Sequence, residues 1–188
     1  MPPAGALLLT PGAGSGADHH TLLALEERLA PLPVARVDFP YRRQGRKAPD
    51  RAPKLIACVR EEAAALVARA GIRPDQLVAG GRSMGGRMCS LAVAERLPAA
   101  GLILLSYPLH PPGKPEVMRT AHFPDLRVPC LFVSGTRDPF GAPAELEGAT
   151  RAIPGPVTLH WVNGAGHDMK NADPEIVAAV QAWLASLA

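Results

Sequence analysis

The sequence has few aromatic residues and only a weak excess of charge of one sign. Aromatic side chains make up 4% of the 188 residues, and the formal net charge is +3. Proteins that bind nucleic acid commonly use a basic stripe for phosphates and aromatic side chains for bases. Here the arginines are scattered along the chain. We therefore expect no nucleic-acid partner.

Cysteines and long apolar runs are also scarce. The three cysteines, Cys58, Cys89 and Cys130, lie within apolar segments and form no CxxC pair. This pattern is typical of buried thiols in a reducing compartment, so we expect a cytoplasmic protein. The first apolar run, at 6–9, is too short to span a membrane and lacks the preceding basic residues of a signal peptide. We interpret it as a strand and expect no membrane partner.

Short apolar segments alternate with segments of helical periodicity along the chain. The expected strands cover 5–10, 34–39, 76–80, 101–106, 130–134 and 157–162. The expected helices cover about 19–30, 53–70, 84–96, 142–152 and a last segment capped by Asp173, and Asp18 is the expected cap of the first helix. Apolar strands that alternate with helices predict a parallel sheet with helices on both faces.

The predicted fold class is therefore α/β, with a single domain over 1–188 and a minimal six-stranded parallel sheet. The connection 107–127 contains five prolines and no sustained apolar helical face. Such a segment cannot easily build a domain of its own, because proline breaks helices and there is little apolar surface to bury. We expect it to form an extended rim, with no cap domain.

A serine motif stands at the centre of the chain. Residues 81–85 (GRSMG) match G-x-S-x-G, after an apolar run and before a helical pattern. This motif makes a sharp strand-to-helix turn that exposes a nucleophilic serine, here Ser83. The N–H groups at the start of the following helix can stabilise an oxyanion. The alternative is a glycine-rich turn with an ordinary serine.

Two further polar residues follow later strands. Asp138 comes after the expected strand 130–134, and His167 comes after 157–162. Because the carboxyl ends of parallel strands meet at one edge of a sheet, Ser83, Asp138 and His167 can meet there. Their chain order of serine, acid and histidine is that of an α/β-hydrolase triad. Taken separately, Asp138 could simply begin a turn and His167 could be an ordinary loop residue.

Oxyanion donors and substrate contacts are expected at the same edge. The backbone N–H groups of Ala13, after the first strand, and of Met84, after the serine, are the candidate donors. Arg42 follows the second strand, where it could bind an anionic substrate or remain a solvated loop charge. Tyr107 and His110 belong to the connection 107–127 and are expected near an acyl pocket.

The sequence resembles the α/β-hydrolase superfamily over nearly its whole length. The resemblance rests on TPGAGSGADH, DFPYRRQGRKAPDR, GGRSMGGR, SYPLHPPGKPE, and SGTRDPFG followed by GAGHD. More narrowly, it resembles the small branch that includes testis-expressed protein 30 and the hydrolase-like domain of NSL complex subunit 3. It is also similar to dienelactone hydrolase-like proteins, although their nucleophile is typically cysteine and this chain has Ser83. The resemblance implies a serine hydrolase that cleaves small acyl esters without a cofactor or a metal.

Three alternatives to such an enzyme remain open. Residues 12–17 (GAGSGA) fit a dinucleotide fingerprint through Gly12, Gly14 and Ala17, with Asp38 at the end of the next strand. A hydrolase fold can also serve as a non-catalytic interaction module, and the small branch includes members without established catalysis. Finally, His19, His20 and His110 could bind a metal, but they lack a fixed ligand spacing.

Overall fold

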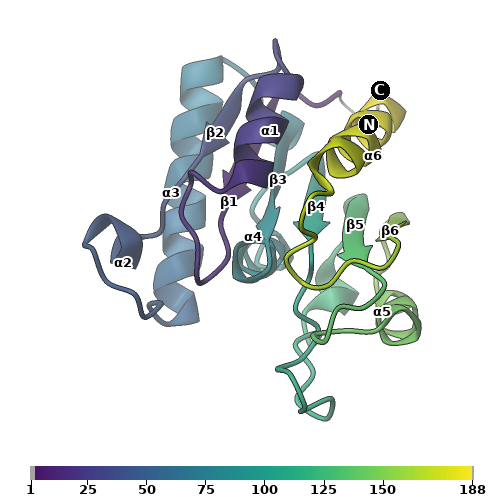
Figure 1. Ribbon diagram of the computed structural model, residues 1–188. Helices are drawn as coiled ribbons and strands as arrows, with labels where there is room; N and C mark the ends of the chain where they lie inside the picture. Colours follow the sequence, from purple (N-terminus) through teal and green to yellow (C-terminus); the bar gives the residue numbers. More distant parts are fainter. Residues whose placement is uncertain (1–2, 188) are drawn as a thin grey trace.

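The computed structural model describes residues 3–187 and has a parallel sheet at its centre (Figure 1). The strands are β1 (Ala6–Thr10), β2 (Val34–Arg36), β3 (Leu77–Arg82), β4 (Gly101–Leu105), β5 (Cys130–Gly135) and β6 (Val157–Val162). All five strand pairs are parallel, and the order across the sheet is β2-β1-β3-β4-β5-β6. The prediction of six parallel strands is confirmed.

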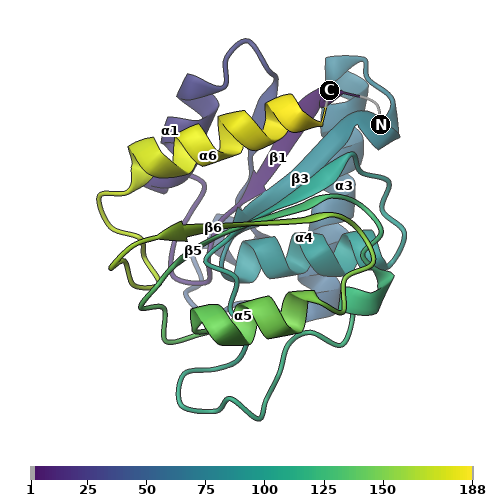
Figure 2. The ribbon, with the colours of Figure 1, turned by 90° about the vertical axis from the view of Figure 1, so that its right-hand side faces the viewer.

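Helices cover both faces of this sheet, as predicted (Figure 2). One face is covered by α1 (His20–Arg28) and α6 (Asp173–Ser186), which pack with the sheet around Leu7, Leu9 and Trp183. The other face is covered by α3 (Ala52–Ala70), α4 (Met84–Ala94) and α5 (Pro143–Thr150). Strands β1, β3, β4 and β5 are almost entirely buried between these layers, which explains why they are apolar throughout.

Some predicted boundaries and caps are wrong. Strand β2 ends at Arg36 instead of residue 39, because the Val37 N–H makes the last bond to Leu9, at 3.0 Å, and Pro40 then begins the short helix α2 (Pro40–Arg43). Asp18 does not cap α1, because the N-cap residue is His19 and its ring accepts from the Thr21 N–H at 3.3 Å.

The second predicted cap, Asp173, is also wrong. This residue is the first of α6, and the N-cap residue is Ala172. The Asp173 carboxylate instead accepts from the Thr21 hydroxyl at 2.7 Å and contacts His20 Nδ1 at 2.6 Å. The carboxylate therefore joins α6 to α1. Such a role across the sheet face has no signature in the local sequence.

The connection between β4 and β5 crosses the edge at which the strands end. Its only helix among the described residues is the 3-10 turn Phe123–Asp125, and no cap domain is inserted anywhere in 3–187. Two hydrogen bonds of 2.8 Å close the connection on itself, from the Tyr107 hydroxyl to the Arg119 carbonyl and from the Arg119 N–H to Leu109. Over the same residues, no helix is long and apolar enough to cross a membrane.

Candidate active site

Ser83 stands at a strained turn between β3 and α4. Its backbone angles are φ 51° and ψ −117°, in a region that side chains rarely adopt. The turn brings the motif's glycines against β1. A Cβ at Gly81 would overlap the Thr10 carbonyl oxygen, and one at Gly85 would lie 2.5 Å from the Pro11 carbonyl oxygen. The two fixed glycines therefore permit the close approach that exposes the serine.

The structure brings Ser83, His167 and Asp138 together at the carboxyl edge of the sheet. Ser83 Oγ lies 2.8 Å from His167 Nε2, and His167 Nδ1 lies 2.8 Å and 3.0 Å from the two carboxylate oxygens of Asp138. An ionised carboxylate only accepts hydrogen bonds, so Nδ1 carries the proton. His167 Nε2 is then free to accept from the Ser83 hydroxyl.

Neighbouring residues hold the imidazole and the carboxylate in place. The side chain of Asp138 is 2% exposed, and its Oδ1 also accepts from the Phe140 N–H at 2.8 Å. The Phe140 ring lies 4.1 Å from the His167 ring, centroid to centroid, and limits its rotation. On the other side, Arg82 Nη2 donates to the His167 carbonyl at 3.1 Å. Burial lowers the pKa of Arg82, and Asp168 and Asp138 partly offset this effect.

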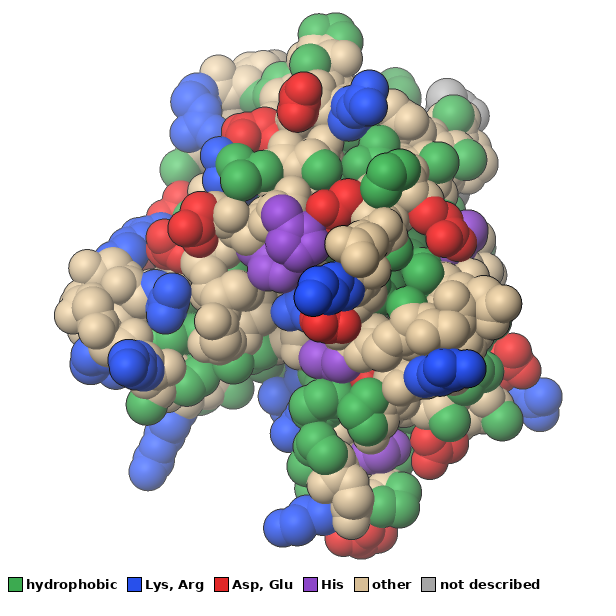
Figure 3. All heavy atoms as spheres, viewed as in Figure 1, with side chains coloured by type: hydrophobic (Ala, Val, Ile, Leu, Met, Phe, Trp, Pro, Cys, Tyr) green, Lys and Arg blue, Asp and Glu red, His purple; other side chains and the backbone are tan. Residues whose placement is uncertain are grey.

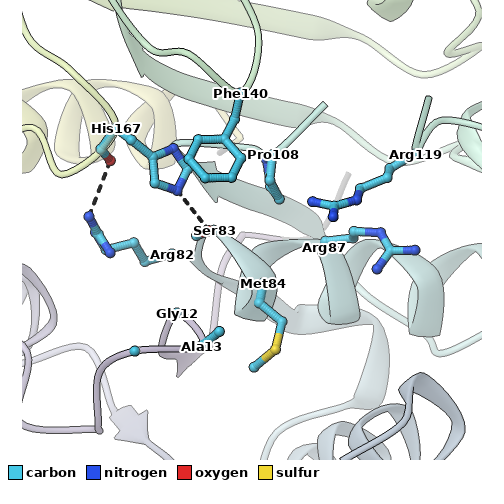
Figure 4. Close-up of a pocket in the computed structure, with 11 residues that line it drawn as sticks. Gly12, Ala13, Arg82, Ser83, Met84, Arg87, Pro108, Arg119, Phe140 and His167 are labelled. Carbon is cyan, nitrogen blue, oxygen red and sulfur yellow. Dashed lines mark hydrogen bonds between the residues drawn. The ribbon is translucent and has the colours of Figure 1, made fainter. Parts of the chain in front are cut away.

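Ala13 and Met84 line the same pocket as Ser83. Met84 is the first residue of α4, and the first N–H groups of a helix have no acceptor within it. The loop that carries Ala13 is held by the Tyr41 hydroxyl, which donates to the Ala13 carbonyl at 2.9 Å. Both residues predicted to supply oxyanion donors therefore line the same pocket as the serine (Figure 4).

The pocket in front of Ser83 has a volume of about 470 Å³. Its walls come from the loop after β1, the elbow, the β4–β5 connection and the loops after β5 and β6; they comprise Gly12, Ala13, Gly14, Arg82, Ser83, Met84, Arg87, Pro108, Arg119, Phe140 and His167. Sequence reasoning missed all three of these arginines. Arg87 had a signal, since it lies four residues after Ser83 on one helix face, whereas Arg119 had none.

The predicted substrate contacts Arg42, Tyr107 and His110 are absent from the pocket lining, which corrects those predictions. Tyr107 is 2% exposed and packs against Phe123 and Phe132, with ring centroids 5.4 and 5.8 Å away. His110 is buried beneath the rim, where Nδ1 lies 2.8 Å from the Pro111 carbonyl oxygen. Tyr107 anchors the β4–β5 connection in the hydrophobic core, whereas polar contacts to Pro111 and Glu145 hold the His110 ring.

Histidines also gather outside the triad, near the middle of the face in Figure 3. The rings of His19 and His20 stack with centroids 4.3 Å apart. Burial, followed by the charge of Arg82, lowers the pKa of His19 to about 4, so this ring is neutral at pH 7. Within 3–187, no group of three or more His, Cys, Asp or Glu side chains is placed to hold a metal.

The dinucleotide alternative is disfavoured by the way its residues are used. Asp38, which would contact the ribose, instead accepts from the Ala17 N–H at 2.8 Å. Gly12 and Gly14 line the pocket of Ser83. Helix α1 begins only at His20, several residues beyond the glycines that would place pyrophosphate at its N-terminus.

A serine elbow at the carboxyl edge of a parallel sheet, with an acid and a histidine after later strands, defines the α/β-hydrolase class. The family model described as "Alpha/beta hydrolase domain" matches residues 3–183. The chain belongs to this family.

Solved structures agree with this fold. A dienelactone hydrolase from Anabaena variabilis is similar, with a TM-score of 0.78 and 18% identity over 98% of this chain and 87% of its own. Est1E from Butyrivibrio proteoclasticus has a TM-score of 0.73 and 16% identity, over 98% of this chain and 88% of its own. A monoacylglycerol lipase from Paleococcus ferrophilus has a TM-score of 0.76 and 15% identity, over 99% of this chain and 96% of its own.

Proposed function

We propose that this chain is a serine hydrolase that cleaves acyl esters through a covalent acyl-enzyme. The observation that carries the proposal is the continuous hydrogen-bonded series from Ser83 Oγ through His167 to Asp138, at the wall of an open pocket. Membership of the α/β-hydrolase family supports it. The three free, buried cysteines are consistent with a cytoplasmic location.

In the first half-reaction, Ser83 Oγ attacks the acyl carbon while His167 Nε2 takes the hydroxyl proton. The tetrahedral intermediate places its oxyanion against the N–H groups of Ala13 and Met84. The bond to the leaving alcohol then breaks, and His167 returns the proton to the alcohol oxygen. Asp138 stabilises the imidazolium throughout and keeps its own charge. The product of this half-reaction is an ester of Ser83.

In the second half-reaction, water attacks the acyl carbon and gives a proton to His167. A second tetrahedral intermediate forms and its bond to Ser83 Oγ breaks. His167 then protonates Ser83, and the acid is released. Every proton passes through Nε2, the ring nitrogen that lies 2.8 Å from Ser83 Oγ.

Covalent labelling with a fluorophosphonate tests this proposal. Intact-mass spectrometry should show one adduct per chain, because Ser83 contacts His167 and lines the open pocket. Ser90 also contacts a histidine, His122 Nε2 at 2.8 Å, but it is fully buried and should not react. The adduct should vanish in Ser83→Ala, form slowly in His167→Ala, and persist in Ser186→Ala, a control at the end of α6. An adduct that persists in Ser83→Ala would contradict the assignment. A wild-type chain that resists labelling would favour the non-catalytic interaction module.

A further inference from the structure

Two arginines stand side by side in the wall of the pocket without an acidic partner. Arg87 comes from the first turns of α4 and Arg119 from the β4–β5 connection (Figure 4). Among residues 3–187, neither guanidinium makes an ion pair or a side-chain hydrogen bond. The Nε of Arg87 is in addition fully buried and has no hydrogen-bond partner.

The surroundings do not neutralise this pair. Burial, followed by the charge of Arg87, lowers the pKa of Arg119, although an arginine stays charged at any ordinary pH. His122 near Arg87 is neutral at pH 7, because burial and Arg87 lower its pKa to about 4. Two like charges held together are unfavourable by themselves, and so is the buried, unpaired Nε of Arg87. An anion between them would relieve the repulsion.

The fold holds Arg119 at this place. Its N–H donates to Leu109 and its carbonyl accepts from the Tyr107 hydroxyl, both at 2.8 Å. Tyr107 and Leu109 are buried, so the turn that presents Arg119 is anchored in the core. Arg87 is held by the helix, with its N–H donating to the Ser83 carbonyl at 3.1 Å. Two positioned guanidinium groups match the geometry of a carboxylate.

The side of the pocket decides which part of the ester carries the anion. In Figure 4, the arginines lie on the other side of Ser83 from His167. A leaving alcohol must face His167, because Nε2 protonates it. The acyl group therefore extends toward the arginines, along Met84 and Pro108, which line the wall between.

We propose that Arg87 and Arg119 bind a carboxylate at the far end of the acyl group, so that the substrates are half-esters of short dicarboxylic acids. This inference rests on the proposed ester hydrolysis and specifies its substrate class. It also replaces Arg42, for which an anion contact was the alternative to a solvated loop charge.

Two p-nitrophenyl esters that differ in one terminal group test the substrate class. Mono-p-nitrophenyl adipate and p-nitrophenyl hexanoate differ only in a carboxylate against a methyl group. We expect kcat/KM, corrected for spontaneous hydrolysis, to favour the adipate by about 10- to 100-fold, the range for charge-assisted hydrogen bonds. The preference should shrink as sodium chloride is added. Equal rates, or a preference for the hexanoate, would overturn the proposal.

Arginine variants assign the preference to the pair. Arg119→Gln and Arg87→Gln should each lower the preference for the adipate, the ratio of its kcat/KM to that of the hexanoate, about 10- to 100-fold. Arg119→Lys should retain part of the preference, since it keeps the charge but not the planar fork. Arg151→Gln, an exposed arginine at the end of α5, is the matched control and should change neither rate. Equal losses for both esters would show a merely structural role.

A leaving-group comparison tests the acyl side. The enzyme should not prefer 4-acetoxybenzoate, whose alcohol carries the charge, over phenyl acetate. A preference for the charged alcohol would contradict the placement of the anion.

A binding measurement separates this inference from the proposed function. Ser83→Ala cannot form an acyl-enzyme, so titration calorimetry with monomethyl adipate measures binding alone. Addition of Arg119→Gln should weaken this binding at least tenfold. A wild-type chain that resists fluorophosphonate labelling, together with arginine-dependent binding, would contradict ester hydrolysis but not the anion site. If the wild-type chain hydrolyses esters but Arg119→Gln does not change the binding of monomethyl adipate, only the anion site would be overturned.

Discussion

Asp138 carries two hydrogen-bonding tasks within one loop. Its carboxylate faces His167 Nδ1 at 2.8 and 3.0 Å and also accepts from the Phe140 N–H at 2.8 Å. The first task orients the imidazole toward Ser83. The second holds the turn that places the Phe140 ring against the imidazole. A substitution that removes the whole carboxylate therefore disturbs both the charge and the shape of the site.

Asp138→Asn separates these tasks, because its amide oxygen can still accept from the Phe140 N–H. We expect Asp138→Asn and His167→Ala each to lower kcat about a thousandfold or more, as triad substitutions do. The double variant should be about as slow as His167→Ala alone, since Asp138 acts only through the imidazole. Steady-state kinetics on one p-nitrophenyl ester measures this coupling.

Asp168→Asn is the control for that experiment, because Asp168 is exposed and adjacent to His167. It should lower kcat little. Circular dichroism spectra should confirm that all variants remain folded. Losses that multiply in the double variant would mean that Asp138 and His167 do not act as one unit.

The residues of the triad could be found from the sequence because Ser83 directly follows the buried strand β3, and Asp138 and His167 lie in the loops after β5 and β6. Strand position is readable from continuous apolar runs, and the carboxyl ends of parallel strands share one edge. Arg119 lacks such a signal. Its place depends on how the β4–β5 connection folds, which is decided by the buried anchors Tyr107 and Leu109. The same anchors explain why Tyr107 itself faces the core.

At the scale of elements, the C-terminal end of α4 could not be predicted from its sequence. The helix stops at Ala94, two residues before the predicted end. Arg96 has a φ of 74°, and the Leu97 N–H returns to the Ala92 carbonyl at 2.9 Å. This is the left-handed helix end that usually contains glycine. An arginine at this position conceals the signal, whereas Gly71 at the end of α3, with φ 63°, made that boundary predictable.

Replacement of Arg96 by glycine should therefore stabilise the protein. Glycine adopts positive φ without a steric cost, so we expect Arg96→Gly to raise the free energy of unfolding by about 0.5–1 kcal/mol. Urea denaturation followed by circular dichroism measures this change. Arg96→Ala removes the same exposed guanidinium but keeps the strained backbone, so it should gain nothing. A decrease in stability for Arg96→Gly would show that the side chain has a role of its own.

Across the whole molecule, the order of the strands determines where chemistry can occur. Strand β3 lies in the middle of the sheet between β1 and β4, so the loop after it is reached from both sides. The loop after β1 brings Ala13 from one side, and the connection after β4 brings Pro108 and Arg119 from the other. The site is thus formed by the loops at the carboxyl edge of the sheet.

The shape of this edge also predicts a preference for short acyl groups. The β4–β5 connection supplies only a rim, and Arg87 and Arg119 line the part of the pocket into which we propose that the acyl group extends. A long neutral chain would have to pass these charges into water. Each methylene that stays in water gains none of the roughly 0.8 kcal/mol available from burial. In a p-nitrophenyl ester series from acetate to palmitate, kcat/KM should therefore be as high for short esters as for long ones, without activation at a lipid interface. A steady rise beyond about eight carbons would reveal an apolar tunnel and contradict this expectation.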